Sequence, residues 1–422
     1  MEETDIVVVG AGLAGLCAAR DLLTAGQQVV LVEARDRVGG RTWSAPFEAA
    51  GCVVDLGAEW VDPQCHLAMM RELERYGIGL EAPEEGAKVA LLSQLAASDS
   101  WQSLLRECDR IADGLDVSQA DWYSQCETYD IPASLFLARQ SLEPEVLDEF
   151  LAHGFALQGA HPDDYSLLNL LHEFASFGGA ESAFSSADYR IDGGAQSLAT
   201  AIAEALPAAL RLNWPVSRIA HCAEGIVVEG PEGSIRAGQA IIALPVNVLR
   251  DMQLDIELPA EAARVIAQGH VGRAAKGWSA ASVSEPIESS GWPNAVEVYS
   301  RRGLHADAIC TFAVAMPDHD EALRQSWLSV EQRHPPVALS DARLSHDWVT
   351  DPYARGSWLS SAPGQMRGLH QLADMPAPCF FAGGDLSRGW YGWMEGAVTS
   401  GRDAAARALA YGKGGSGLPA TA

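Results

Sequence analysis

The first forty residues contain the pattern that most restricts the fold. A β-branched apolar run from Ile6 to Val9 leads into a glycine-rich segment from Gly10 to Gly15, and a second apolar run from Val29 to Val32 ends at Glu33. Apolar residues at helical spacing predict a helix between the two runs, from Leu16 to Ala25. Strands this apolar are typical of a parallel sheet buried on both faces. The pattern predicts a strand–helix–strand unit within an α/β fold.

The glycines and the acidic residue of this unit predict a dinucleotide site. In the pattern GxGxxG, Gly10 permits a tight turn, Gly12 lets a pyrophosphate approach the backbone, and Gly15 lets helix and strand pack closely. The helix N-terminus offers unpaired N–H groups to the phosphates. Glu33 would accept hydrogen bonds from an adenosine ribose. The contacts predicted in this stretch are Gly10, Ala11, Gly12, Ala14, Gly15 and Glu33.

The net charge of the chain argues against some classes of binding partner. Lys and Arg number 29 against 56 Asp and Glu, a formal net charge of −27. Nucleic acid and anionic membrane surfaces repel such a chain, so neither is expected as a partner. No secretory signal or membrane-spanning apolar run is visible, and the eight cysteines form no CxxC pair or zinc-like cluster. We expect a cytoplasmic protein without a bound metal, with a homodimer left open.

The residues after Glu33 resemble the flavin-containing amine oxidase (monoamine oxidase) superfamily, whose ligand is FAD. The resemblance starts at Val30 and continues through the segment Arg37-Val38-Gly39-Gly40-Arg41 and Thr42. A Gly-Gly-Arg sequence gives close backbone approach and a guanidinium group for phosphate oxygens. The resemblance therefore implies further FAD contacts at Ala34, Arg35, Gly39, Gly40 and Arg41.

Four later blocks resemble the same family in the same order. They are Asp55 to Val61, Asp192 to Leu198, Ile241 to Pro245, and Phe380 to Asp385 together with Trp390 to Val398. The likeness spans residues 5 to 410 and is strongest to small soluble bacterial members such as hydroxynicotine oxidase. It implies FAD contacts at Gly57, Ala58, Glu59, Trp60, Val216, Ala243, Trp348, Gly384, Asp385, Trp393, Met394 and Ala397.

The resemblance also implies the domain organisation. The fold class is α/β, with an FAD-binding Rossmann-like domain and an α+β substrate domain formed from insertions. The FAD-binding domain is expected at 1–80, 189–255 and 345–412, the substrate-binding domain at 81–188 and 256–344, and a flexible tail at 413–422. Apolar spacing predicts helices from Ser100 to Leu115, Val146 to Leu157 and Ser166 to Phe177, and a strand from Ala308 to Val314.

The implied activity is that of an FAD-dependent amine oxidase. A hydride passes from the carbon next to the amine nitrogen to flavin N5, the imine hydrolyses to a carbonyl, and O₂ is reduced to H₂O₂. The amine must react uncharged, which suits a dry aromatic site because desolvation lowers the pKa of an ammonium group. Lys276 resembles the family lysine that holds a water against N5, and Trp358 and Trp393 resemble the walls of the aromatic cage. The plainer interpretations are a surface lysine and ordinary core tryptophans.

Departures from the family pattern and several side chains leave alternatives open. Ser357 stands where membrane-bound members carry a flavin-linking cysteine, so we expect non-covalent FAD. Glu59 either recognises a second cationic group of the substrate or pairs with an arginine. His153, His161 and His172 either line the pocket or are hydrogen-bonded structural residues.

Three alternative functions remain at this stage. An L-amino acid oxidase of the same superfamily needs an arginine to bind the substrate carboxylate, and Arg139, Arg273 and Arg302 are the candidates. A flavin amine dehydrogenase would pass electrons to an acceptor other than oxygen. A flavoprotein scaffold with a vestigial site would be an interaction module. The sequence names neither the amine nor its stereochemistry.

Overall fold

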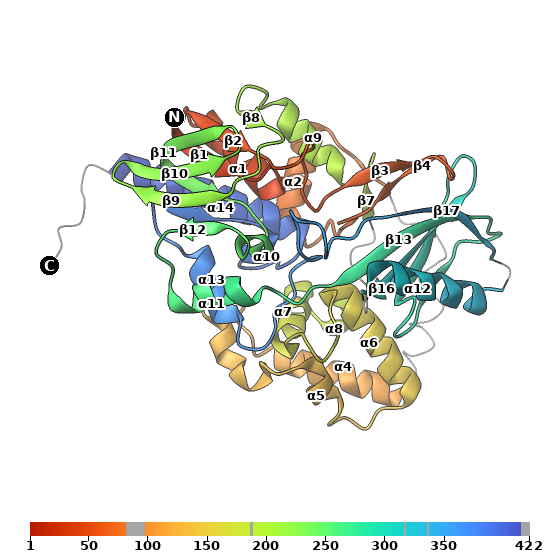
Figure 1. Cartoon of the computed structure of the whole chain (residues 1–422). Helices are drawn as coiled ribbons and strands as arrows, with labels where there is room; N and C mark the ends of the chain where they lie inside the picture. Colours follow the sequence, from red (N-terminus) through yellow and green to blue (C-terminus); the bar gives the residue numbers. More distant parts are fainter. Residues whose placement is uncertain (82–97, 186–188, 316–317, 336, 415–422) are drawn as a thin grey trace.

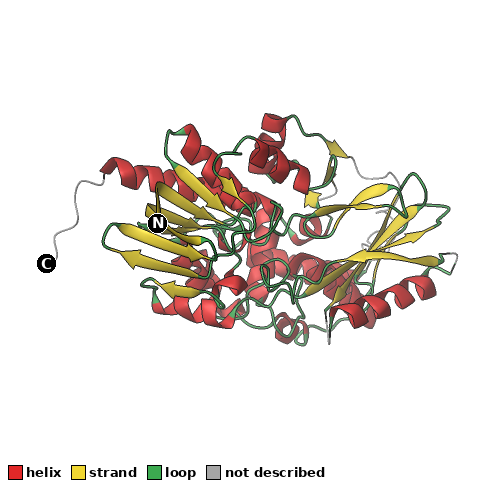
Figure 2. Ribbon diagram, turned by 45° about the horizontal axis from the view of Figure 1, so that its top comes forward, coloured by secondary structure: helices red, strands yellow, loops and turns green. Residues whose placement is uncertain are grey.

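The molecule contains two main β-sheets, which occupy opposite halves of the view in Figures 1 and 2, with helices packed on them and between them. The computed structural model describes residues 1–81, 98–185, 189–315, 318–335 and 337–414. Residues 415–422 of the expected tail lie outside this set. Residues 413 and 414 form the end of helix α14 (Met394–Gly414).

The larger sheet has eight strands and a parallel centre. Its strands are β1 (Glu2–Val9), β2 (Val29–Val32), β8 (Leu210–Arg211), β9 (Arg218–Cys222), β10 (Gly225–Gly230), β11 (Gly233–Ile242), β12 (Gln253–Asp255) and β18 (Cys379–Phe381). The order is β12-β9-β10-β11-β1-β2-β8, and β18 pairs with the end of β11. The pairs β1/β2, β1/β11, β2/β8 and β11/β18 are parallel. The predicted α/β fold with a Rossmann-like sheet is confirmed.

Both faces of β1 are buried, which explains its continuous apolar sequence. Ile6 and Val8 pack in a cluster with residues of α1, α9 and α14, whereas Val7 and Val9 belong to a second cluster with residues of α10, α11 and α13. The helices around this sheet are α1 (Leu13–Thr24), α2 (Leu67–Tyr76), α9 (Gln196–Glu204), α10 (Val246–Leu249), α11 (Ala260–Gln268), α13 (Met366–Ala373), α14 and the 3₁₀ helix η2 (Gly384–Leu386).

The glycine-rich turn brings α1 directly against the end of β1. Gly10 has a φ of +99°, which favours glycine, and its N–H donates to the Val32 carbonyl at 2.7 Å. A Cβ on Gly15 would lie 1.9 Å from the carbonyl oxygen of Gly10. Helix α1 therefore starts at Leu13, three residues before the predicted start, and Gly15 lies inside its first turn.

The second main sheet is antiparallel. Its order is β14 (Glu288–Ser290), β15 (Glu297–Arg301), β16 (Asp307–Val314), β13 (Ala274–Ala281) and β17 (Leu339–Ser345). Helix α12 (His319–Arg333) packs on it, with Leu323 and Trp327 in a shared cluster with Ala275 and Ala313. The predicted strand lies within β16. Shorter sheets pair β3 (Ser44–Phe47) with β4 (Cys52–Asp55), and β7 (Tyr189–Ile191) with β5 (Trp60–Val61) and β6 (Leu80–Glu81).

A helical layer lies below the sheets in Figure 1. It consists of α4 (Asp99–Ala112), the 3₁₀ helix η1 (Trp122–Tyr129), α5 (Ala133–Leu137), α6 (Pro144–Gln158), α7 (Leu167–Phe177) and α8 (Ala180–Phe184). All three helices predicted in this region are confirmed. Ser98 caps α4 and Ser166 caps α7 through side-chain acceptance of backbone N–H groups.

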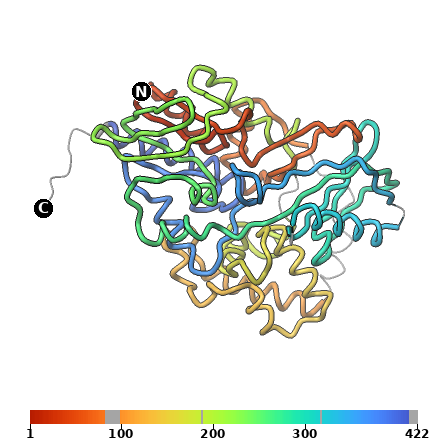
Figure 3. The backbone as a smooth tube through the Cα atoms, in the orientation of Figure 1, coloured from red at the N-terminus to blue at the C-terminus, as the bar shows by residue number. Residues whose placement is uncertain are grey.

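Distant parts of the chain meet in the half of the molecule that contains the larger sheet. The tube in Figure 3 shows the N-terminal, central and C-terminal segments side by side there, as the strand order requires. The expected domain boundaries are in keeping with this arrangement and stay a prediction. Among the described helices, none is long and apolar enough to cross a membrane.

Replacing Gly15 with alanine should disrupt this turn. The added Cβ would collide with backbone rather than with a movable side chain, so we expect a loss of about 1–3 kcal/mol in unfolding free energy and weaker flavin retention. Gly389→Ala is the matched control, because a Cβ at Gly389 meets no atom within 4 Å. Thermal unfolding and flavin absorbance measure both effects. Equal stability and flavin content in the two variants would contradict the packing argument.

Candidate active site

One cavity joins the glycine-rich turn of the larger sheet to the second sheet. Its wall includes residues of α1, α6, α14, β13 and β16. The predicted site residues that line it are Gly10, Gly12, Ala14, Glu33, Ala34, Arg35, Gly39, Gly40, Arg41, Gly57, Ala58, Glu59, Trp60, Val216, Ala243, Lys276, Trp348, Trp358, Gly384, Trp393, Met394 and Ala397. Segments that are far apart in sequence thus meet at one cavity.

Three predicted contact residues, Ala11, Gly15 and Asp385, lie outside the lining set. The Ala11 N–H donates to the Glu33 carboxylate at 2.7 Å, and Gly15 faces the Gly10 carbonyl. Asp385 is buried and binds Arg41. These three residues shape the cavity by holding residues that do line it.

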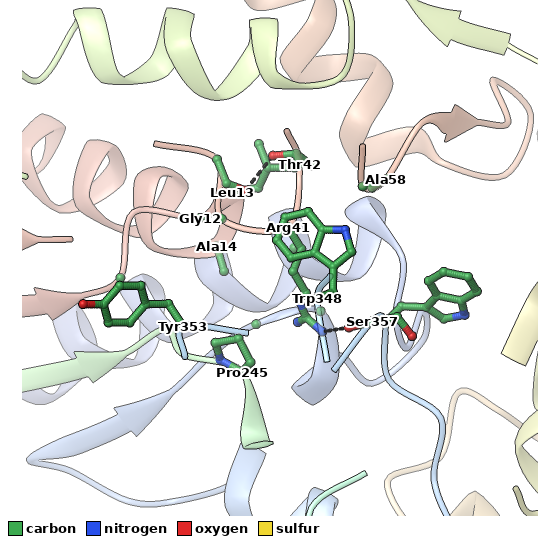
Figure 4. A pocket seen from close by; sticks show the side chains of 18 of the residues that line it. Gly12, Leu13, Ala14, Arg41, Thr42, Ala58, Pro245, Trp348, Tyr353 and Ser357 are labelled. Carbon is green, nitrogen blue, oxygen red and sulfur yellow. Dashed lines mark hydrogen bonds between the residues drawn. The ribbon is translucent and has the colours of Figure 1, made fainter. Parts of the chain in front are cut away.

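The N-terminus of α1 opens onto the cavity. Gly12 is the N-cap, no side chain caps the helix, and its first turn carries no acidic residue. Gly12, Leu13 and Ala14 line the cavity and lie together in Figure 4. A Cβ on Gly12 would approach no atom closer than 4.0 Å, so bare backbone faces the open space. Free helix N–H groups and bare backbone suit a pyrophosphate.

The Glu33 end of the cavity suits the adenosine part of a dinucleotide. Glu33 is 6% exposed, and its two oxygens accept the N–H groups of Ala11 and Arg35 at 2.7 and 2.9 Å. Arg35 pairs with Asp351 at 2.8 Å, and its guanidinium lies 5.3 Å from the centre of the Tyr353 ring. These contacts fix the charged groups at the rim of this end.

Arg41 crosses the middle of the cavity wall. It donates to the Ser357 carbonyl at 2.8 Å, the contact drawn in Figure 4, and to Asp385 at 2.6 Å. Asp385 also accepts the N–H of Val246 at 2.9 Å. Burial would raise the pKa of Asp385, but Arg41, His270 and the Val246 N–H together lower it below its ordinary value. The carboxylate therefore stays charged and holds Arg41 in place.

A buried ion cluster occupies the end of the cavity at the second sheet. Glu59, 2% exposed, accepts from Lys276 Nζ at 2.6 Å, from Arg190 Nε at 2.7 Å and from the Tyr299 hydroxyl. Lys276, 4% exposed, also donates to the Gly57 carbonyl at 3.1 Å. Of the two interpretations of Glu59, pairing with an arginine is the one seen here, with a lysine as a second partner.

The ion cluster keeps its charges. Burial would raise the pKa of Glu59, but the charges of Lys276 and Arg190 lower it to about 2. Burial would lower the pKa of Lys276, but Glu59 raises it above its ordinary value. One carboxylate and two cations leave a net charge of +1 in the cluster. Lys276 is therefore a charged, buried residue and not a surface lysine.

Aromatic side chains form the rest of this end. Trp60, Phe312, Trp358 and Trp393 line the cavity beside Lys276. The Trp358 N–H donates to the Leu157 carbonyl at 2.7 Å, and the Trp393 N–H donates to Glu173 at 3.0 Å. Both indoles are thus oriented by hydrogen bonds at their far edges, as wall residues rather than fillers of the general core.

The three histidines of the helical region do not line the cavity. His153 contacts Glu149 at 3.0 Å, and His161 packs near Trp292. His172 is fully enclosed beside Trp122, and burial lowers the pKa of His172 to about 3. None of the three lines the pocket, and the hydrogen-bonded interpretation is supported for His153 and His161; the buried Nε2 of His172 has no hydrogen-bond partner among the described residues. Among the described residues, no group of three or more His, Cys, Asp or Glu side chains could hold a metal ion.

Sequence reasoning missed several residues that build this site. Arg190 and Tyr299 complete the Glu59 cluster, and Glu173 holds Trp393. Phe312 and Glu297 line the substrate end from strands β16 and β15. No motif marks these positions, because their roles arise from strand and helix packing. Glu173 and Phe312 lie in a predicted helix and a predicted strand, and Arg190 lies next to the Asp192 block, but those patterns did not indicate their partners.

Comparison with known proteins agrees with the geometry. The family model described as flavin containing amine oxidoreductase matches residues 13–409. The chain belongs to this family. The resemblance inferred from the sequence is therefore confirmed, and the protein is a flavin-dependent enzyme of the amine oxidoreductase class.

Relatives within the family include both oxidases and dehydrogenases. The chain is 26% identical to (S)-6-hydroxynicotine oxidase of Paenarthrobacter nicotinovorans, covering 93% of this chain and 96% of the relative. It is 25% identical to pseudooxynicotine dehydrogenase of Pseudomonas sp, covering 97% and 87%. The solved structure of cyclohexylamine oxidase from Brevibacterium oxydans IH-35A shares the fold, with a TM-score of 0.85 at 23% identity over 97% of this chain and 99% of that one.

Replacing Glu59 with glutamine should destabilise the protein. The change leaves Lys276 and Arg190 buried without their anion, a loss of about 3–5 kcal/mol in unfolding free energy. The double variant Glu59→Gln/Lys276→Met should regain part of the lost unfolding free energy, because it removes one of the two unpaired buried cations. The exposed pair Glu107–Arg110 supplies the control Glu107→Gln, which should leave the melting temperature unchanged.

The difference in unfolding free energy between the wild type and Glu59→Gln should depend on pH. The pKa of Glu59 is depressed on folding, so its contribution is complete above about pH 4.5 and is lost as the pH falls toward 2. The stability difference between wild type and Glu59→Gln should shrink over that range in denaturant titrations. A difference that is zero at pH 7 would contradict the charge assignment.

Proposed function

We propose that the protein is an FAD-dependent amine oxidase that produces an imine and hydrogen peroxide. The observation that carries the proposal is one cavity with an uncapped helix N-terminus in its wall at one end and an aromatic, lysine-containing chamber at the other. When bound, FAD would supply the acceptor for a hydride from the carbon next to the amine nitrogen. The tasks left to the protein are binding, orientation, exclusion of water and electrostatics.

The residues present fit FAD as a whole dinucleotide. Glu33 serves the ribose, the α1 terminus and Gly40 serve the pyrophosphate, and the first turn of α14, through Met394 and Ala397, faces the remainder of the cavity. None of the eight cysteines and none of the eleven histidines lines the cavity. This distribution supports non-covalent binding, as the serine at position 357 indicates.

The chamber supports an amine with an apolar body as substrate. Trp60, Phe312, Trp358 and Trp393 offer ring faces, with the small Ala156 and Ala274 beside them. Such a dry wall favours the uncharged amine, whose lone pair assists hydride departure. The rings of Trp358 and Trp393 would orient the amine, and Lys276 would hold a water at the reacting edge.

An amino acid substrate is less well supported. Arg139, Arg273 and Arg302 do not line the cavity. Within the described residues, the lining arginines are Arg35 and Arg41, whose side chains are held by Asp351 and Asp385. A substrate carboxylate would therefore lack a free guanidinium group in the chamber.

The acceptor of the electrons has two candidates. Lys276 keeps its positive charge, which would stabilise the negative charge that develops when oxygen is reduced, and this favours an oxidase. Glu59 offsets part of that charge, and two related proteins are named dehydrogenases, so a non-oxygen acceptor is the second candidate. A cytoplasmic location and a homodimeric state stay predictions.

An amine panel read by peroxide release tests the proposal. It contains aryl-alkyl amines, cyclic secondary amines, a polyamine and amino acids. We expect peroxide with amines that carry an apolar body, and kcat/KM at least about tenfold lower with amino acids, because the lining arginines Arg35 and Arg41 are already paired with aspartates and Lys276 is already paired with Glu59. Highest activity with amino acids would contradict the substrate class, and flavin reduction without peroxide would favour the dehydrogenase.

Lys276→Met separates the two half-reactions. Removing the charge should slow reoxidation of the reduced protein by oxygen about 10²-fold. Reduction by the amine should change less, since the tryptophans that orient the substrate remain. Stopped-flow absorbance of each half-reaction gives the comparison. Unchanged reoxidation would remove Lys276 from the oxygen step.

A further inference from the structure

Glu173 is a buried carboxyl group that the proposed chemistry does not use. It lies on α7 and is 5% exposed; one oxygen accepts the Trp393 N–H at 3.0 Å and the other accepts from Gln158 Nε2 at 2.7 Å. No ion pair in the described part of the chain includes it, and burial raises the pKa of Glu173 to about 8. Burying an unpaired carboxyl group is unfavourable, so its presence points to a role other than packing.

The hydrogen bonds of Glu173 lead to the C-terminal end of α6. The Gln158 side-chain oxygen accepts from Asn169 and from the Ser360 hydroxyl. The neighbouring residue, Leu157, accepts the Trp358 N–H through its carbonyl at 2.7 Å. Two consecutive residues of one helix end therefore hold both tryptophan rings, Trp358 directly and Trp393 through Glu173.

Two aromatic rings pack against Trp393. Its centroid lies 5.0 Å from that of His66 and 5.4 Å from that of Phe177. His66 accepts the Asp62 N–H at Nδ1, and burial lowers the pKa of His66 to about 4, so the ring is neutral at physiological pH. Ring packing against these neutral groups is weakly directional, so the Glu173 hydrogen bond is the directional contact that sets the angle of the indole.

We propose that Glu173 is a positioning residue, which accepts the Trp393 N–H and fixes that ring relative to Trp358 as one wall of the amine site. This inference rests on the proposed function, in which both rings orient the substrate. Without an acceptor at this position, the half-buried indole N–H loses its partner and the ring has to move to find another. A displacement of about 1 Å in an orienting group can cost about 10²-fold in rate.

Four variants and a control test the role. Glu173→Gln keeps an oxygen acceptor for the indole, and Glu173→Met removes it at similar volume. Trp393→Phe keeps a ring without the N–H, and the double variant combines Glu173→Met with Trp393→Phe. Glu149→Gln is the matched control, because Glu149 is buried on α6 and binds His153 and Ser290 instead of a cavity residue.

We expect the Glu173→Met substitution to lower kcat/KM only when residue 393 carries an indole N–H. Glu173→Met should lower kcat/KM about 10- to 100-fold with flavin content unchanged, and Glu173→Gln should restore most of it. In the Trp393→Phe background, the same methionine substitution should cost less than about twofold. Wild-type rates in Glu173→Met, or an equal loss in both backgrounds, would overturn the proposal.

The NMR signal of the Trp393 indole tests the Glu173 hydrogen bond without any measurement of enzyme turnover. In ¹⁵N-tryptophan-labelled protein, Trp393→Phe identifies the Trp393 indole signal among the twelve tryptophans. Glu173→Gln should shift that signal more than any other, and it serves alone if Glu173→Met does not fold. An unmoved Trp393 signal would overturn the inference. If no amine reduces the wild-type flavin, the proposed function fails, while this signal still reports whether Glu173 holds Trp393.

Discussion

The close contact between Gly15 of α1 and the carbonyl of Gly10 is the constraint on which the site depends. It sets the N-terminus of α1 against the end of β1, with no side chain in between. The same helix packs on α14 through a second close backbone contact, because a Cβ on Gly401 would lie 2.1 Å from the Ala14 carbonyl oxygen. The two helix termini that face the cavity are thereby held as one unit.

The charged side chains differ between the two ends of the cavity. Arg35 near Glu33 and Arg41 in the middle of the cavity wall are each held by a buried aspartate, so they form fixed donors and not mobile charges. At the other end, the ion cluster of Glu59, Lys276 and Arg190 links the loop before β5 with β7 and β13. The cluster keeps a cation beside a chamber lined by aromatic rings and by Glu297, and this cation fits the proposed reduction of oxygen.

The sequence predicted the parts that depend on local pattern. The strand–helix–strand unit, the three helices of the first insertion and the strand in β16 follow from apolar spacing, and most of the predicted residues that line the cavity follow from motifs. Glu173, Arg190 and Tyr299 could not be predicted, because each acts through a residue more than a hundred positions away. Glu59 was recognised as charged and near the site, but its partners depend on which strands lie beside it.

Anaerobic titration of the purified protein, followed by its visible spectrum, tests the central claim most directly. We expect flavin absorption at about one equivalent per chain, and loss of that absorption when an amine with an apolar body is added. A colourless protein that gains no flavin absorption when FAD is supplied would contradict the account. So would bound flavin that no amine bleaches.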